Sequence, residues 1–328
     1  IRQLETLLES EDAFQAFVRY AETALGPRVD DMKTANVIID NALKPLAEIG
    51  ALDDIPVVVA YTGDEEKTGS PLQVARRDLI EAGKWADIAL GFEGAIHYDG
   101  QDWATIARRS SSSWILEVEG RQAHSSGIFG EDVGAGAIFE ASRILNAFYE
   151  DVRGEEYLTF NAGNIQGGTD VTYDSQQSRG TSFGKTNVVP RKVVVHGGLR
   201  TISLEQLTRA KEKMEAIVAQ SHPHTSATIS FRDSYPPMKP TEGNQRLQQV
   251  LSEINEALGR GPMPVLDPSL RGAADISFVA PYADSLAGLG ALGKGGHSPE
   301  ESLDLASMPL AIKRAAILIY RLGSEGQP

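Results

Sequence analysis

The chain of 328 residues is too long for one small core and suits two domains. Its net charge of −14 disfavours nucleic acid as a partner because no basic patch can neutralise phosphates, and no apolar run approaches the ~18 residues that span a bilayer. The sequence has no cysteine, which excludes disulfides and thiolate ligands, so any metal must be bound by carboxylate and imidazole groups.

The first part of the chain has the pattern of an α/β domain. Apolar residues near helical spacing predict a helix over residues 1–25. From Asp31 to Glu93 the pattern alternates between helix and strand, which predicts a mostly parallel sheet. Within this stretch, the apolar run Ile55–Ala60 is predicted to be a buried strand. The composition changes at Arg108–Ser113, and we place a domain boundary there.

Residues 109–233 predict a second domain inserted into the first. Its elements follow the order strand, helix, strand, strand, helix, strand, which is the ferredoxin-like pattern. These elements are Trp114–Glu119, Val133–Phe148, Tyr157–Phe160, Arg191–Leu199, a helix that opens with the capping box Ser203–Gln206, and Thr228–Phe231. The chain then returns to the first domain over residues 234–328. The sequence therefore predicts an α/β domain in two parts, residues 1–108 and 234–328, interrupted by an α+β domain.

Acidic and histidine side chains occur beside the predicted strands and helices. Glu65 and Glu66 follow the first apolar run, and Glu93 ends a second one. Asp31 directly precedes a helical segment, and His297 follows two glycines before the last helix. Taken singly, each has an ordinary alternative, such as a solvated loop acid or an acid that complements a helix dipole. Together, carboxylate and imidazole groups from separate strand ends are what a catalytic zinc site requires.

The order of these acids and the final Gly-Gly-His resemble the dinuclear zinc peptidase and deacylase family. This family includes glutamate carboxypeptidase, acetylornithine deacetylase, succinyl-diaminopimelate desuccinylase and aminoacylase. The resemblance extends from about Gly26 to the C-terminus, roughly nine tenths of the chain. It implies that residues 1–108 and 234–328 form a zinc-hydrolase catalytic domain and that residues 109–233 form a dimerisation domain.

The resemblance also implies two Zn²⁺ ions per chain, replaceable by Co²⁺ or Mn²⁺. Asp31 would bridge the two ions, Glu66 and His297 would complete one site, and Glu93 would bind the other ion. Glu65 would be the general base that takes a proton from water and passes it to the leaving amine.

Three residues of the inserted domain match further positions of the family. His124, in Gln122-Ala123-His124-Ser125, would reach across a homodimer interface and polarise the scissile carbonyl. Asn187 and Arg200 match positions that bind the substrate carboxylate, and a guanidinium group suits that task because it can donate two parallel hydrogen bonds. The alternatives are a turn asparagine and a surface arginine.

One motif of the family is missing. The family places a His-x-Asp motif before the bridging aspartate, and its histidine binds the same ion as Glu93. Residues 1–30 contain no histidine, and we expect a segment to be missing from this sequence. Because the chain begins at Ile1 rather than Met, an amino-terminal segment, which could include a signal peptide, is expected to have been removed or omitted. The compartment stays open between cytoplasm and periplasm.

The function implied is a zinc-dependent hydrolase that cleaves an amide or peptide bond next to a free carboxylate. Its substrate would be an N-acyl amino acid or a short peptide, with neither nucleic acid nor membrane as a partner. Two alternatives stay open. One is a catalytically inactive family member that serves as a ligand-binding or assembly module, for which the missing histidine is the motivation. The other is an N-carbamoyl amino acid amidohydrolase.

Overall fold

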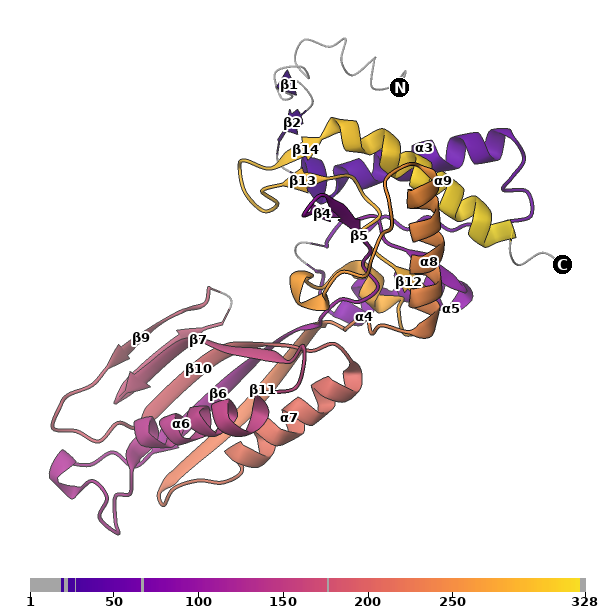
Figure 1. Cartoon of the computed structure of the whole chain (residues 1–328). Helices are drawn as coiled ribbons and strands as arrows, with labels where there is room; N and C mark the ends of the chain where they lie inside the picture. Colours follow the sequence, from indigo (N-terminus) through magenta and orange to yellow (C-terminus); the bar gives the residue numbers. More distant parts are fainter. Residues whose placement is uncertain (1–18, 21–22, 27, 66–67, 176, 325–328) are drawn as a thin grey trace. The chain divides into compact units, whose positions relative to one another are not determined.

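The computed structural model describes residues 19–20, 23–26, 28–65, 68–175 and 177–324 (Figure 1). The chain divides into two compact units. Unit 1 comprises Ile1–Ala107, Pro240–Leu270 and Phe278–Pro328, and unit 2 comprises Arg108–Lys239 and Arg271–Ser277. The α/β fold class with an inserted ferredoxin-like domain is confirmed.

Unit 2 contains a four-stranded antiparallel sheet in the order β11–β6–β10–β7. Its main elements are β6 (Ser111–Gly120), α6 (Gly136–Ala147), β7 (Thr159–Gly168), β10 (Lys192–Arg200), α7 (Leu204–Val218) and β11 (Thr225–Tyr235). The helices α6 and α7 pack on one face of the sheet (Figure 1). A hairpin of β8 (Asp170–Asp174) and β9 (Arg179–Phe183), which the sequence does not indicate, lies between β7 and β10 in the chain.

The core of unit 2 follows from the period-two pattern of its strands. Trp114, Leu116 and Val118 alternate along β6 and are buried because successive strand side chains point to opposite faces. The helix α7 begins as its capping box predicts, since Ser203 Oγ accepts a hydrogen bond from the Gln206 amide at 3.1 Å.

Unit 1 contains helices and short strands. The sequence predicts a mostly parallel sheet here, whereas the described strands form one parallel pair and otherwise pair antiparallel. The elements are β1 (Arg19–Tyr20), β2 (Thr23–Leu25), α3 (Thr34–Glu48), α4 (Leu72–Ala75), α5 (Arg77–Trp85), β3 (Ile88–Leu90), β4 (Ile96–Tyr98), β5 (Gln101–Trp103), α8 (Glu242–Ala257), β12 (Asp284–Leu286), β13 (Gly293–Lys294), β14 (Ser302–Asp304) and α9 (Met308–Ser324). The strands β1, β2, β14 and β13 form an antiparallel sheet in that order, whereas β3 and β12 pair in parallel. The hairpin β4–β5 is a separate antiparallel pair.

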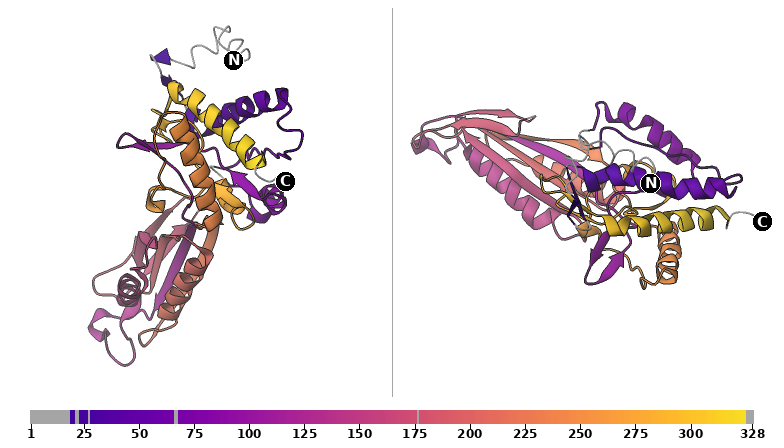
Figure 2. Two further views of the ribbon diagram at one scale, coloured as in Figure 1. Left: turned by 45° about the vertical axis from the view of Figure 1, so that its right-hand side comes forward. Right: turned by 90° about the horizontal axis from the view of Figure 1, so that it is seen from above.

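Two helices from distant parts of the sequence form the core of unit 1. α3 and α9 lie side by side in every view (Figures 1 and 2). Ile38 and Ala42 of α3 are fully buried, as is Leu318 of α9. Apolar residues spaced three and four apart make one stripe of each helix, and these stripes pack in the same hydrophobic cluster. Among the described residues, no helix combines the length and the hydropathy needed to cross a bilayer.

Two predicted elements differ in the structure. The part of the predicted 1–25 helix that is described contains β1 and β2 instead, because β2 pairs with β14, which lies almost 280 residues further along the chain; residues 1–18 lie outside the described residues. The predicted buried strand Ile55–Ala60 pairs with none of the described strands, and Val58 is 58% exposed. A strand needs a neighbour for its backbone amides and carbonyls, and no described segment pairs with this one.

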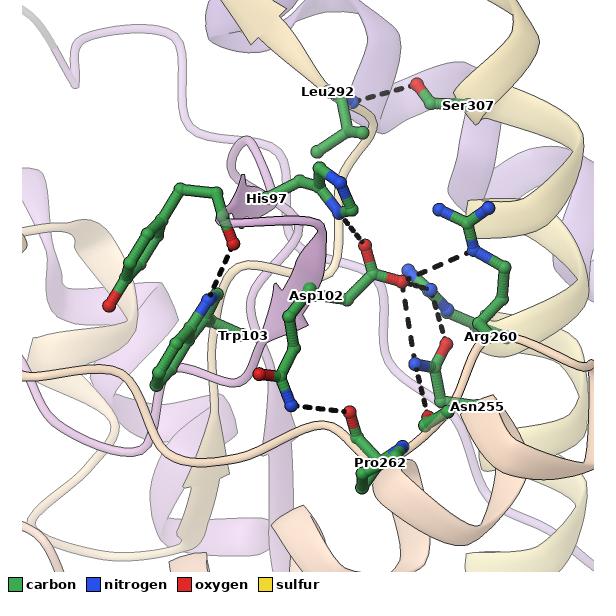
Figure 3. Close-up of polar contacts among 12 residues, drawn as sticks. His97, Asp102, Trp103, Asn255, Arg260, Pro262, Leu292 and Ser307 are labelled. Atoms are coloured by element: carbon green, nitrogen blue, oxygen red, sulfur yellow. Dashed lines mark hydrogen bonds and ion pairs between the residues drawn. The ribbon is translucent and has the colours of Figure 1, made fainter.

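A buried ionic network ties the β4–β5 hairpin to α8 and α9. The buried carboxylate of Asp102 receives hydrogen bonds from His97 Nδ1 at 2.6 Å and from the guanidinium of Arg314 (Figure 3). Asn255 of α8 contacts the same two residues, Asp102 and Arg314. Burial alone would raise the pKa of Asp102, but the hydrogen bond from His97 and the charge of Arg314 outweigh it, so the pKa is lowered.

We expect Asp102→Asn to lower the free energy of unfolding of unit 1 by about 3–5 kcal/mol, because the buried Arg314 guanidinium then lacks a counter-charge. The folded-state pKa of Asp102 is lowered. The stability that Asp102 contributes is therefore fully present above the ordinary pKa of an aspartate, and it is lost as the pH falls through the lowered pKa. Urea unfolding at neutral pH measures the change. Asp99→Asn at the exposed tip of the same hairpin is the matched control, and equal midpoints for the two variants would contradict the prediction.

Candidate metal centre

Two of the predicted metal ligands lie close together in unit 1. Asp31 lies in the turn Val29–Lys33 that precedes α3, and His297 lies in the turn between β13 and β14. The distance from His297 Nε2 to Asp31 Oδ2 is 3.4 Å, and the two side chains are 69% and 32% exposed. Two donors at ~2.0–2.1 Å from one tetrahedral zinc ion lie roughly 3.3–3.4 Å apart. The donor types and their separation therefore fit a shared zinc ion.

The loop that carries Glu93 approaches the turn that carries Asp31. The amide of Gly290 donates to the carbonyl of Glu93 at 2.9 Å, which ties this loop to the chain segment that leads to β13. A Cβ atom on Gly94 would lie 3.2 Å from Asp30 Oδ2, and one on Gly293 would lie 2.1 Å from Asp30 Cγ. The chain segments that carry Asp31, Glu93 and His297 therefore meet around the Asp30 side chain.

The two adjacent glutamates belong to the loop between α3 and α4. Glu66 lies outside the described residues, and Glu65 is half-buried. In the part of the chain that the structure describes, no three His, Asp or Glu side chains are placed together as a ready metal cage. Asp31 and His297 are a pair of proposed ligands that the structure brings within contact distance.

Asp64, directly before the two glutamates, holds their loop in place. It accepts hydrogen bonds from the Gly69 amide at 2.7 Å and from Arg76 Nη1 at 2.5 Å. Arg76 is fully buried, with its guanidinium carbon 5.6 Å from the centroid of the Phe278 ring. The hydrogen bond from the Gly69 amide lowers the pKa of Asp64 most, and the hydrogen bond from Arg76 lowers it next. The sequence does not reveal this contact, because nothing in it distinguishes Arg76 from the exposed Arg77.

A buried acid near His297 was also not predicted. The carboxylate of Glu301, four residues after His297, accepts hydrogen bonds from the backbone amides of Arg28, Asp30 and Asp31. Burial raises the pKa of Glu301, but the hydrogen bonds from the three amides and the charge of the nearby His297 lower it by more. The pKa of Glu301 therefore lies below its ordinary value. The sequence shows Glu301 only as one of two adjacent glutamates, and nothing in it indicates that Glu301 rather than Glu300 is buried.

In unit 2 the structure brings His124 and Asn187 together. His124 forms an isolated antiparallel bridge with Val188, and the Ser125 amide donates to the Asn187 carbonyl at 2.9 Å. The Ser126 amide donates to His124 Nδ1 at 3.2 Å, which makes Nδ1 an acceptor. In the neutral imidazole the proton must then be on Nε2. His124 is exposed, so this N–H is a donor available to a ligand.

Arg200 lies at the opposite end of the sheet from Asn187. Asn187 precedes β10, whereas Arg200 is its last residue and pairs with Thr159 of β7. A nine-residue strand spans roughly 26 Å at ~3.3 Å per residue. Arg109 Nη1 donates to Thr159 Oγ1 at 3.0 Å, which places a second guanidinium group close to Arg200. The structure therefore does not bring Asn187 and Arg200 of one chain together.

We expect Arg76→Lys to lower the temperature of thermal unfolding by a few degrees and to speed amide hydrogen exchange over residues 63–69. A lysine cannot reproduce the planar contact with Phe278 while it binds Asp64. The same loss of protection is expected in the wild type as the pH falls through the lowered pKa of Asp64, since its ion pair is present only above that value.

Arg77→Lys is the matched control, because the Arg77 side chain is 67% exposed and pairs with its neighbour Asp78. If both variants showed the same exchange over residues 63–69, Arg76 would have no special part in holding this loop.

Comparison with known proteins places these features in context. The family model of a peptidase dimerisation domain matches residues 106–226. Carboxypeptidase G2 of Pseudomonas sp. strain RS-16 is 26% identical over 317 residues, which are 92% of this chain and 68% of that protein.

Solved structures share the fold. The aminopeptidase PepT of Bacillus cereus superposes with a TM-score of 0.68 at 17% identity, over 93% of this chain and 76% of that chain. The M20 family metallo-carboxypeptidase Sso-CP2 of Sulfolobus solfataricus superposes with a TM-score of 0.63 at 16% identity, over 94% of this chain and 79% of that chain.

Proposed function

We propose that this chain, which is similar to carboxypeptidase G2 and shares the fold of an M20 family metallo-carboxypeptidase, is a zinc-dependent hydrolase that cleaves an amide or peptide bond next to a free carboxylate. The observation that carries this proposal is the approach of Asp31 Oδ2 to His297 Nε2 at 3.4 Å. An imidazole and a carboxylate at this separation, both partly exposed, form an open site for a cation. The substrate is an N-acyl amino acid or a short peptide.

The residues proposed to hold two zinc ions are Asp31, Glu66, Glu93 and His297. Asp31 would be shared by the two ions, because the side chain of its neighbour Asp30 lies against the segments that carry Glu93 and His297. Bound zinc supplies a water whose pKa is lowered to about 7 and a positive charge that stabilises a developing oxyanion.

Glu65 is proposed as the general base. Its carboxylate would take a proton from the attacking water and deliver it to the nitrogen of the leaving amine. A general base must be held at a fixed distance from the reacting atoms, and the hydrogen bonds that Asp64 accepts from Gly69 and Arg76 hold the loop that carries Glu65.

Substrate binding is proposed to require two copies of the chain. The backbones of His124 and Asn187 lie together beside the start of β10, and Arg200 is the last residue of this strand, which is roughly 26 Å long. An amino acid is much shorter than this distance. Asn187 and Arg200 can therefore bind one small substrate only if different chains contribute them, which supports a homodimer in which His124 acts on the partner's substrate. The match to a peptidase dimerisation domain also supports this arrangement.

We expect purified protein to contain about two zinc ions per chain, and we expect chelation to abolish hydrolysis of N-acyl amino acids or dipeptides. Elemental analysis and an assay before and after dialysis against a chelator measure both, with zinc added back as the control. Activity that survives exhaustive chelation would contradict the proposal. A protein that binds no metal but does bind carboxylated ligands would instead be a catalytically inactive member of the family.

We expect Glu65→Gln and His124→Ala each to lower kcat by about 10²–10⁴-fold, because each removes one group that acts in the transition state. If His124 acts on the partner's substrate, mixing the two inactive variants creates heterodimers in which one of the two sites is intact. Statistical exchange of subunits should then restore about one quarter of the wild-type activity.

Each variant incubated alone, under the same exchange conditions, is the control for this complementation. If His124 acts within its own chain, every site in the mixture lacks one group and activity stays at the level of the single variants. That outcome would contradict the shared site.

A further inference from the structure

A carboxylate that is not among the proposed ligands connects the two ligand turns of the metal centre. Glu301 is 2% exposed, and its two oxygens accept hydrogen bonds from three amides of the turn that carries Asp31. We infer that Glu301 is a positioning residue for the zinc ion shared by Asp31 and His297, and that it fixes the distance between these two ligands. This inference rests on the proposed function.

The first step is the way the amides converge. Glu301 Oε2 accepts from the Arg28 amide at 2.7 Å, and Oε1 accepts from the amides of Asp30 and Asp31 at 2.8 and 2.9 Å. Arg28 has a φ of 61°, in the left-handed region, which lets neighbouring amides point to a common centre. Such a group of amides is an anion-binding nest. Here the nest holds a carboxylate of the same chain.

The second step is that Glu301 is itself held in place by backbone contacts. The Gly26 amide donates to the Glu301 carbonyl at 3.1 Å, and the next residue, Ser302, pairs with Leu25 in the β2–β14 ladder. The turn of His297 is closed by the Ser298 amide, which donates to the Gly295 carbonyl at 3.0 Å, and the Glu301 amide donates to the Ser298 carbonyl at 3.3 Å. Glu301 therefore links the turn of His297 to the turn of Asp31 through both its backbone and its side chain.

The third step concerns where the Asp31 carboxylate is directed. The Asp31 amide is bound to Glu301, while its side chain lies 3.4 Å from His297. If the Asp31 backbone shifted after losing its hydrogen bond to Glu301, the distance between Asp31 and His297 would change directly. The separation of two ligands on one zinc ion is set by the coordination geometry, so the ion would be bound less tightly.

A carboxylate suits this position better than an amide side chain. A glutamine has one acceptor oxygen, which could keep the bonds to Asp30 and Asp31, but its NH₂ group would then face the Arg28 amide. Two donors that face each other at hydrogen-bond distance repel, and one buried amide is left unsatisfied. The structure therefore predicts graded effects, with Glu301→Gln losing part of the nest and Glu301→Ala losing all of it.

The experiment compares wild type, Glu301→Gln, Glu301→Ala and the control Glu300→Gln, whose side chain is exposed in the same turn. Zinc is removed from each full-length protein, and the dissociation constant for zinc is measured by competition with a chromophoric chelator. Amide hydrogen exchange over residues 28–33 is followed in the metal-free proteins. Values of kcat and KM are measured after zinc is restored at saturation.

We expect the zinc dissociation constant to rise by about 10–100-fold in Glu301→Gln and further in Glu301→Ala. Exchange should become faster over residues 28–33, KM should stay within about twofold and kcat should fall, because the ligand geometry rather than substrate binding is changed. Glu300→Gln should match the wild type in every measurement.

Two outcomes would be negative, and they differ. If the wild type binds zinc and the two Glu301 variants bind it equally tightly, with the wild-type kcat, the inference is overturned and the proposed function stands. If the wild type itself binds no zinc, the proposed function fails, and the inference fails with it.

Discussion

The candidate site depends on one strand pairing. β2 and β14 are joined in register with Ala24 opposite Leu303, although almost the whole chain separates them in sequence. Asp31 lies six positions after the end of β2, and His297 lies in the short turn that leads into β14. Closing so long a loop costs conformational entropy, which the core formed by α3 and α9 offsets. Without this pairing the two groups that approach at 3.4 Å would have no reason to meet.

The residue types that could bind a metal are limited by the composition of the chain, and the full ligand set stays a prediction. With no cysteine in the chain, only carboxylates and imidazoles can bind zinc, and the order of Asp31, Glu93 and His297 matches a known arrangement. The residues that hold these groups could not be predicted in the same way. Glu301 and Arg76 each have a neighbour of the same type, and only burial distinguishes Glu301 from Glu300 or Arg76 from Arg77.

The fold shows the same limit. The strands and helices of unit 2 follow local periodicity and capping, as for β6 and the Ser203 cap, so their order was correctly predicted. Elements whose state depends on distant partners were not. The apolar residues before residue 25 are spaced as in a helix, yet β2 in this segment pairs with β14. The segment Ile55–Ala60 is rich in valine, as strands are, yet no described strand pairs with it.

The length of β10 has a consequence for how the activity would respond to dilution. Under the proposed dimer, no single copy holds both Asn187 and Arg200 at the same ligand, because nine residues of rigid strand keep them apart. The fraction of complete sites would therefore follow the monomer–dimer equilibrium, and specific activity would fall as the protein concentration drops below the dissociation constant of the pair. A strand inside one chain would thereby make turnover depend on the abundance of the protein itself.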